Sequence, residues 1–285
     1  MSDIKSGTPQ RSYRPNNRAD ANIFSAIAAL IGEIRQYRSH IATIFAADFK
    51  NTYRGTVFGV FWNFTLPLIP ISVYILLVSL RVFPRFEGIP PAVYLSFNVT
   101  MWMLLTGVIT RSIQVVKSRT QEAMKTSIPL TAAISSSFAQ LCFDTLVRLV
   151  LVAVLVAVFG PVPKVNILWL LLAISSGLLF CLSIGLTLSI FNMIYTDVER
   201  LTTIVLQYGI FLSGVIFPIS TLGPLAVTEN YNPFNVFIKS ARDFLFFGGH
   251  PDAAALLAWA GVAVVLSLLS LRFFYVMELR IRETV

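Results

Sequence analysis

Residues 41–80 read IATIFAADFKNTYRGTVFGVFWNFTLPLIPISVYILLVSL, and this stretch decides the fold. It passes without a break from a charged, amphipathic part into an apolar part that has no charged residue over 57–80. At about 1.5 Å of rise per residue, a helix over those positions can cross roughly 30 Å of hydrocarbon. Lipid offers the backbone no hydrogen-bond partners, so we expect one helix that bends at Pro67 and Pro70 without ending there.

The composition of the whole chain agrees with a membrane-embedded fold. The 285 residues are 56% hydrophobic and only 13% charged, and the mean hydropathy is +0.75. We therefore expect an all-α integral membrane protein. The net charge of +8 fits the basic loops that orient an inner-membrane protein, so it does not indicate nucleic acid as a partner. The two cysteines, Cys142 and Cys181, lie in apolar runs and predict no disulfide.

Two segments precede the first span. Residues 1–20 are polar and have no apolar core, so we expect a disordered cytoplasmic lead-in and not a secretory signal peptide. Residues 21–52 form a predicted amphipathic helix, because apolar side chains recur at steps of three and four. Such a helix lies flat on a membrane surface or against a partner, or packs within a small cytoplasmic domain. Its apolar face is made of Ile23, Ile27, Leu30, Ile34, Tyr37, Ile41 and Ile44.

Residues 53–285 make up the predicted transmembrane domain. A basic loop, Arg111–Pro129, follows the second span and contains one or two helical turns, while a polar break at 195–200 separates the fourth and fifth spans. Before the last span we expect a short interfacial or re-entrant helix over Phe234–Phe247, which an Asn-Pro pair begins and two glycines end. A charged tail follows the last span. The six expected spans are 57–80, 93–110, 131–159, 165–194, 201–217 and 253–276.

The basic residues predict the orientation of these spans. Sixteen of the 22 Lys and Arg residues fall in the termini and loops on the side of the N-terminus, and five fall in the loops on the opposite side. Cytoplasmic loops carry the excess of basic residues. We therefore expect both termini in the cytoplasm, as in an inner-membrane protein.

The sequence contains no motif that would bind ATP or carry out a reaction that could drive transport. No glycine is followed by lysine, which excludes a phosphate-binding loop of the G-x-x-x-x-G-K type, and the two histidines and two cysteines form no metal or nucleophile constellation. Uphill transport would then depend on a partner or on an ion gradient. Asp144 and Arg148, four residues apart in the third span, form either a mutually neutralised intramembrane ion pair or part of a proton relay. A single pair gives the relay little support, so the partner-driven route ranks higher.

Two further patterns lie within the spans. Small residues recur every four positions along the fourth span, at Gly177, Cys181, Gly185 and Ser189, and allow another helix to approach closely, either within the subunit or at a dimer seam. Aromatic side chains in the first and fifth spans are candidates for a substrate channel, with an interfacial aromatic belt as the alternative. The channel candidates are Trp62, Phe64, Tyr74, Tyr208, Phe211 and Phe217.

The start of the first span resembles a known family. The pattern YRGS-x-L-G-x-x-W-x-x-x-x-P of the membrane subunits of type 2 ABC exporters, particularly those for O-antigen and capsular polysaccharide, is similar to Tyr53-Arg54-Gly55, Gly59, Trp62 and Pro67. Thr56 and Phe58 stand where Ser and Leu are commoner, which is a mild departure. Three later features agree in order: the basic loop ending in Ile128-Pro129, Asp197 at the polar break, and Asn232-Pro233 followed by Arg242.

The resemblance implies a homodimer in which two copies form a channel for a lipid-linked glycan, and each copy binds a cytoplasmic ABC ATPase subunit. ATP and Mg would be bound by the ATPase, so this chain would be no enzyme and hold no cofactor. The amphipathic helix with Tyr53 and Arg54 would form a gate where the glycan enters, and the helix over 234–247 would close the outer mouth. The implied ATPase-coupling residues are Lys117, Arg119, Glu122 and Lys125 in the basic loop, with Asp197, Glu199 and Arg200 as a second contact.

Several other functions stay open at this stage. Within transport, the alternatives are an ABC exporter of drugs or of a teichoic acid-like polymer, and a secondary transporter that uses Asp144 and Arg148. A membrane-embedded glycosyltransferase or acyltransferase is a further alternative. It would need a cluster of carboxylates, histidines or a metal site near the membrane surface, and the loops offer only scattered charges.

Overall fold

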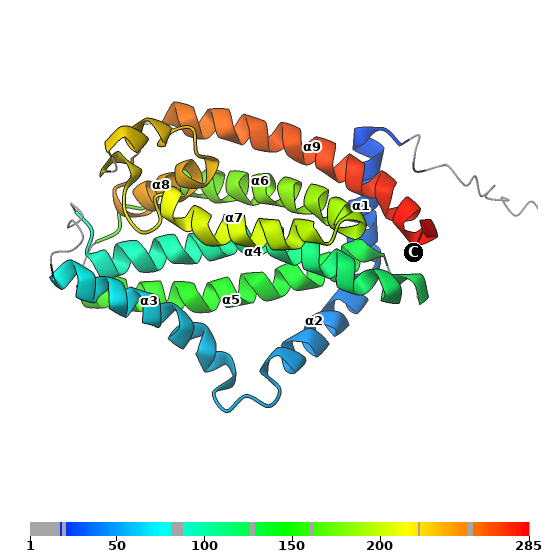
Figure 1. Cartoon of the computed structure of the whole chain (residues 1–285), viewed down its shortest axis with the longest axis horizontal. Coiled ribbons are helices and arrows are strands. Elements are labelled where there is room, and N and C mark those ends of the chain that lie inside the picture. Colours follow the sequence, from blue (N-terminus) through cyan, green and yellow to red (C-terminus); the bar gives the residue numbers. More distant parts are fainter. Residues whose placement is uncertain are drawn as a thin grey trace, which may run out of the picture.

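A computed structural model of the chain describes residues 18, 21–80, 88–125, 129–159, 162–221, 223–249 and 253–284, and every regular element in these ranges is a helix. Four long helices run side by side along the long axis of the molecule (Figure 1). In the described part of the chain, these four are long and apolar enough to cross a membrane. They are α4 (Pro91–Lys125), α5 (Leu130–Phe159), α6 (Ile167–Ile194) and α9 (Ala253–Thr284).

Helix α4 lies at the centre of the bundle. In its most apolar 18-residue window, 83% of the residues are buried, against 22–33% in the other three helices. Its buried polar side chains donate hydrogen bonds inside the protein: the Asn98 amide group donates to the carbonyl oxygens of Gly214 and Val215, and the Ser96 hydroxyl donates to that of Val93. The predicted second span is therefore less apolar than the others because it faces protein instead of lipid.

The same helix corrects the predicted loop at 111–129. Helix α4 continues without interruption to Lys125, so the basic segment is the second half of one helix and not a loop with one or two helical turns. Ile113 and Val116 are fully buried, so the first turns of this half pack against the rest of the protein. The next helix begins at Leu130, directly after Pro129.

Helix α6 packs closely against α4 through its small residues. A Cβ atom on Gly185 would stand 3.0 Å from Ile109 Cα of α4, and one on Gly177 would stand 3.0 Å from Leu105. Cys181 and Ser189, from the same stripe, are completely buried. Of the two interpretations of this stripe, the structure supports close packing within the subunit.

The predicted amphipathic helix over 21–52 consists of two helices, α1 (Ile23–Gln36) and α2 (Arg38–Tyr53), with a break at Tyr37. The side chain of Asn22 accepts a hydrogen bond from the Ser25 amide and caps α1. Helix α1 crosses the end of the bundle near the C-terminus (Figure 1) and buries Leu30 in a cluster with Phe274 of α9. It therefore packs on its own chain, against α9 and α5.

The first predicted span begins with a 3-10 turn, Gly59–Phe61, and continues as α3 (Trp62–Ser79). The helical backbone continues through both prolines, as expected. Together α2, the turn and α3 form a V that projects sideways from the bundle (Figure 1). Residues 81–87, between the first two predicted spans, lie outside the described ranges, as does nearly all of the predicted lead-in over 1–20.

Helix α7 (Asp197–Leu212) differs at both ends from the predicted fifth span. The polar break shortens to Tyr195-Thr196, so Asp197 and Glu199 lie in the first turn of α7. Negative charges at this end of a helix interact favourably with the helix dipole. The helix ends before Gly214, whose φ of +64° is a conformation that suits glycine. Two 3-10 turns, Ile219–Thr221 and Gly223–Thr228, follow it.

Helix α8 (Pro233–Phe246) confirms the short helix predicted before the last span, while its depth in a membrane stays a prediction. The Asn232 side chain accepts hydrogen bonds from two amides of its first turn, and Gly248 follows its end with a φ of +72°. The helix is deeply buried against α4, α6 and α9. It lies at the opposite end of the bundle from α1 (Figure 1).

The predicted charged tail is a continuation of α9 to Thr284. Glu278 within it is completely buried: Arg18 donates to one carboxylate oxygen at 2.8 Å, and the Leu130 amide donates to the other at 3.0 Å. Arg18 also pairs with Glu33 of α1 at 2.8 Å. Burial alone would lower the pKa of Arg18, but the two carboxylates outweigh it and raise the pKa above its ordinary value. These contacts join α1, α5 and α9.

Candidate functional site

Two of the residues expected to couple to an ATPase meet at the end of the bundle that carries α1. Lys117, in the second half of α4, forms an ion pair with Glu199, in the first turn of α7, with a distance of 3.3 Å between Nζ and Oε2. The Asn192 side chain of α6 accepts a hydrogen bond from the Glu199 amide and holds that turn in place. Segments 82 residues apart in the sequence therefore form one surface.

A hollow of about 710 Å³, lined mostly by residues with polar side chains, lies at this surface. Its lining combines the side of α4 with the start of α7, and the charged groups of both helices are partly exposed there. An exposed ion pair of this kind contributes little to stability, which leaves its charges available to a partner. The lining residues are Lys117, Thr196, Glu199, Arg200, Thr203 and Ile204.

The other coupling candidates are distributed around the same end. Arg119 forms an ion pair with Asp48 of α2 at 2.6 Å and so joins the basic half of α4 to the predicted gate. Arg200 and Asp197 lie one turn apart at 3.6 Å and are almost fully exposed. The backbones of Glu122 and Lys125 belong to α4, while their side chains lie outside the described part of the structure.

The predicted gate residues lie where α2 ends beside α5. The Tyr53 hydroxyl donates a hydrogen bond to Asp144 at 3.3 Å, and its ring packs on Phe49, which in turn contacts Phe143 edge to face. Arg54, the next residue, is exposed. The end of α2 is thereby bound to the middle of α5.

Asp144 forms its ion pair between helices. Its Oδ2 atom lies 2.8 Å from Arg111 of α4, which also donates to the Ser137 carbonyl at 3.1 Å. The predicted i,i+4 partner, Arg148, remains within electrostatic reach of Asp144, Arg111 and Tyr53, but its buried Nε atom has no hydrogen-bond partner. This differs from the expected pairing because Arg111 lies inside a helix that faces α5, where the sequence analysis placed a loop.

The channel candidates lie on helices that both contact α4. Trp62 of α3 is 39% exposed, Tyr208 and Phe211 of α7 are 63% and 47% exposed, and Phe217 after α7 is half-buried. No residue of α7 is buried in the single chain. These side chains are thus available for a channel, for lipid or for a second subunit. The side chains of Phe64 and Tyr74 lie outside the described part of the structure.

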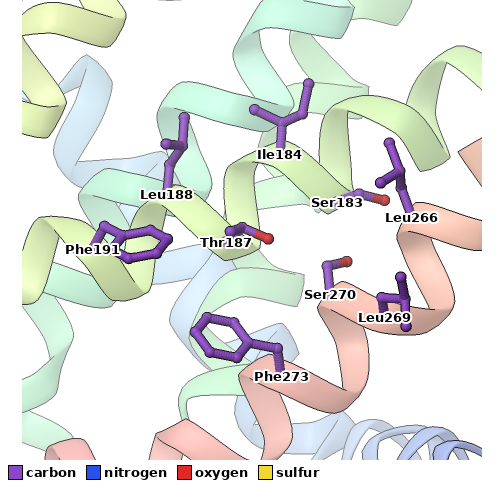
Figure 2. Close-up of a pocket in the computed structure, with 9 residues that line it drawn as sticks. All are labelled: Ser183, Ile184, Thr187, Leu188, Phe191, Leu266, Leu269, Ser270 and Phe273. Atoms are coloured by element: carbon purple, nitrogen blue, oxygen red, sulfur yellow. The ribbon is translucent and has the colours of Figure 1, made fainter.

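A second hollow, of about 480 Å³, lies between α6 and α9 and contains none of the predicted site residues (Figure 2). Figure 2 shows Phe191 and Phe273 at one end and Leu266 at the other. The hydroxyls of Ser183 and Ser270 along it bond to carbonyls of their own helices. With largely apolar walls, this groove suits an apolar ligand better than a polar substrate.

Arg111 and Glu278 belong to these networks but are not among the predicted functional residues. The sequence pattern predicts a loop at Arg111 and a charged tail at Glu278. One signal was available, because neither Gly nor Pro occurs between Val108 and Ile128 or after Gly261, so nothing in either segment ends a helix. The burial of the charges carries no sequence signal of its own.

Comparison with known proteins gives two matches that cover most of the chain. The sequence profile of the ABC-2 type transporter family matches residues 39–246. The chain is also 22% identical over 240 residues to the O-antigen export system permease protein RfbA of Myxococcus xanthus, covering 83% of this chain and 92% of that protein.

Proposed function

Because the chain belongs to the ABC-2 type transporter family, we propose that it is the channel-forming membrane subunit of an ATP-driven exporter of a lipid-linked polysaccharide. The family and the four apolar helices make it a multi-pass membrane protein and a permease component of an ABC transporter. The substrate class, O-antigen or capsular polysaccharide, is supported by the similarity to an O-antigen export permease. The bacterial inner membrane, with both chain ends in the cytoplasm, is the proposed location.

The observation that carries the proposal is the charged end of α4 beside α7. A single helix runs from the centre of the bundle to Lys125, and its basic half lies against the first turn of α7 at the Lys117–Glu199 pair. A cytoplasmic ATPase subunit that docks in the adjoining hollow would therefore push on the most buried helix of the protein. Such a contact would allow motion of the ATPase subunit to change the packing of the membrane bundle.

Two copies of the chain would enclose the channel. The unburied face of α7 and the exposed aromatic residues of α3 and α7 are the surfaces that a second copy would cover or that would line the bore. Closure of the two ATPase subunits on ATP would bring the two α4 ends together and change the width of the bore. The helix pair α1 and α2 would form the gate for the glycan.

Co-purification with the ATPase tests this proposal. Charge reversal in Lys117→Glu, and the double substitution Glu122→Lys with Lys125→Glu, should reduce the amount of ATPase that co-purifies with the full-length chain. Lys164→Glu, which reverses an exposed charge between α5 and α6, is the control and should leave the amount unchanged. Undiminished binding in all variants, with normal membrane insertion, would contradict the coupling surface.

The alternatives differ in what they transport and in their source of energy. A cell that lacks this gene and accumulates its glycan inside would support polysaccharide export over export of a drug or of a teichoic acid-like polymer. A secondary transporter would have to use Asp144, whose carboxylate is already bound by Arg111 and Tyr53. Export that continues in ATP-depleted vesicles with a proton gradient would favour that alternative.

A further inference from the structure

Helix α7 runs along the bundle beside α4 and α6 (Figure 1). None of its residues is buried in the single chain, although Leu206 and Ile210 pack partly buried against the apolar core. Its first turn is attached to α4 by the ion pair between Glu199 and Lys117, which is exposed to water and therefore stabilises little. The attachment at the other end of α7 is buried and of a different kind.

The turn that follows α7 is bound to α4 through buried hydrogen bonds. The Tyr94 hydroxyl donates to the Gly214 carbonyl oxygen at 3.0 Å. The Asn98 amide group donates to the carbonyl oxygens of Gly214 and Val215 at 3.3 and 3.1 Å. Tyr94 is 3% exposed and Asn98 is completely buried. A buried carbonyl outside a helix needs a hydrogen-bond donor, and α4 supplies it for both residues of the turn.

The same turn fits closely against α8. Gly214 has a φ of +64°, and a side chain there would overlap with Asn235 of α8. The Asn232 amide group, at the start of α8, donates to the Leu212 carbonyl oxygen at 2.7 Å, and Val215 is completely buried. Helix α8 packs in turn against α4. The end of α7 therefore cannot shift along α4 without the loss of several buried contacts.

We propose that Tyr94 and Asn98 are positioning residues for export, because they make α7 move together with α4. This role rests on the function proposed above, in which the ATPase subunit moves α4 and α7 contributes to the channel wall. Since both ends of α7 are bound to α4, a displacement of α4 carries α7 and its exposed aromatic residues with it. The bore then changes width by the joint movement of the two helices, and α7 does not act as a separate gate.

Amide hydrogen exchange of the full-length chain in phosphatidylcholine nanodiscs, without any ATPase, tests the attachment. The double variant Tyr94→Phe with Asn98→Leu removes the donors to Gly214 and Val215 and nearly keeps the size of both side chains. Amides in the last turn of α7 and in residues 213–217 should exchange about tenfold faster, because buried hydrogen bonds that resist local opening are lost. Amides of α6 and α9 should keep their exchange rates.

Ser96→Ala is the matched control for these exchange rates. It removes a buried hydroxyl from the same part of α4, but this hydroxyl donates to the Val93 carbonyl of its own helix, so exchange at the end of α7 should not change. Size-exclusion profiles show whether each variant is folded. If the double variant is not, Tyr94→Phe alone removes a single hydroxyl and should give a smaller increase. Unchanged exchange at the end of α7 in the folded variants would overturn the attachment.

Spin-label distances between the two subunits test the joint movement. One label per subunit would be placed at Gln114 of α4 or at Leu212 of α7, which are both exposed, in a chain with Cys142→Ser because Cys142 is an exposed free cysteine. Trapping of the ATPase subunits with ATP and vanadate should change both distances in the wild type. In the double variant, the distance at Gln114 should still change. The change at Leu212 should shrink at least about twofold, because α7 is then released from α4 at one end.

The outcomes separate this role from a structural one and from a failure of the proposed function. Loss of both distance changes in a folded double variant would indicate a structural role and overturn the positioning role. A wild type in which α4 responds to ATP and α7 does not would also overturn it, but would leave the proposed function intact. If the ATPase neither binds the chain nor changes the distance at Gln114, the proposed function is wrong, and the role of Tyr94 and Asn98 in export is wrong with it. The exchange rates would still decide whether α4 holds α7.

Discussion

Substitution of Gly185 by alanine should force α6 away from α4. The added Cβ atom would stand 2.9 Å from Ser112 Oγ and 3.0 Å from Ile109 Cα, where unstrained carbon contacts are about 3.5–4.0 Å. Neither neighbour can move aside easily, because Ile109 Cα belongs to the backbone and the Ser112 hydroxyl is bound to the Val108 carbonyl at 2.7 Å. The two helices must therefore separate along their contact.

The size of the effect follows from a comparison with Gly261. That glycine also lies inside a long helix, but a Cβ atom there would meet nothing within 4 Å. Both substitutions gain up to about 1 kcal/mol of helix propensity, so their difference isolates the overpacking cost of roughly 1–3 kcal/mol. Gly107→Ala should fall between them, because its Cβ would meet the mobile end of Leu141 at 2.7 Å.

Thermal unfolding followed by fluorescence-detected size exclusion measures this difference. For a chain of this size, the midpoints of Gly185→Ala and Gly261→Ala should lie roughly 2–10 °C apart, with Gly185→Ala the lower. Heating rates must be equal, since membrane proteins often unfold irreversibly. A midpoint for Gly185→Ala at or above that of Gly261→Ala would refute the close packing of α6 on α4.

Three further predictions concern the polar contacts. Arg18→Met should leave buried Glu278 without its cation and so lower the free energy of unfolding. Because Arg18 is itself 24% exposed, we expect a loss near the low end of about 3–5 kcal/mol. Arg35→Met, on the exposed side of α1, is the control, and equal unfolding midpoints for the two variants would contradict the prediction. Asn232→Ala should cost about 1–2 kcal/mol through the lost cap of α8, and a chain as stable as the wild type in thermal unfolding would argue against that cap. A double-mutant cycle on Asp48 and Arg119 should show a coupling free energy of about 0.5–1 kcal/mol, whereas the same cycle on the exposed pair Asp197 and Arg200 should show almost none. If the coupling of Asp48 with Arg119 is no larger, this ion pair does not hold α2 against α4.

Much of the architecture could be predicted because apolar runs and caps act locally. The long apolar segments became α5, α6 and α9 within a few residues at their starts, and the Asn-Pro pair and Gly248 marked α8. The sequence-based predictions are wrong where a charged segment is expected to end a helix. Arg111, Asp197 and Glu278 were assigned to a loop, a polar break and a tail, yet all three are helical, because a helix ends at Gly, Pro or a cap and not at charge.

The candidate site was harder to predict because its contacts join distant segments. Tyr53 and Asp144 are both predicted functional residues, but they lie 91 residues apart in the sequence. No local pattern indicates that their side chains form a hydrogen bond. Likewise the Arg111–Asp144 pair depends on the packing of α4 against α5, which a one-dimensional pattern does not specify. The number of membrane spans and the depth of α8 stay predictions.

The uninterrupted course of α4 has a mechanical consequence. Its 35 residues extend over about 50 Å, from a first turn near α8 to a basic end beside α7, with no proline after Pro91. A hinge would have to break backbone hydrogen bonds that are shielded from water by the surrounding helices. A displacement of one end of α4 would therefore move the other end as well. The helix would transmit this movement across the bilayer without a change in its own secondary structure.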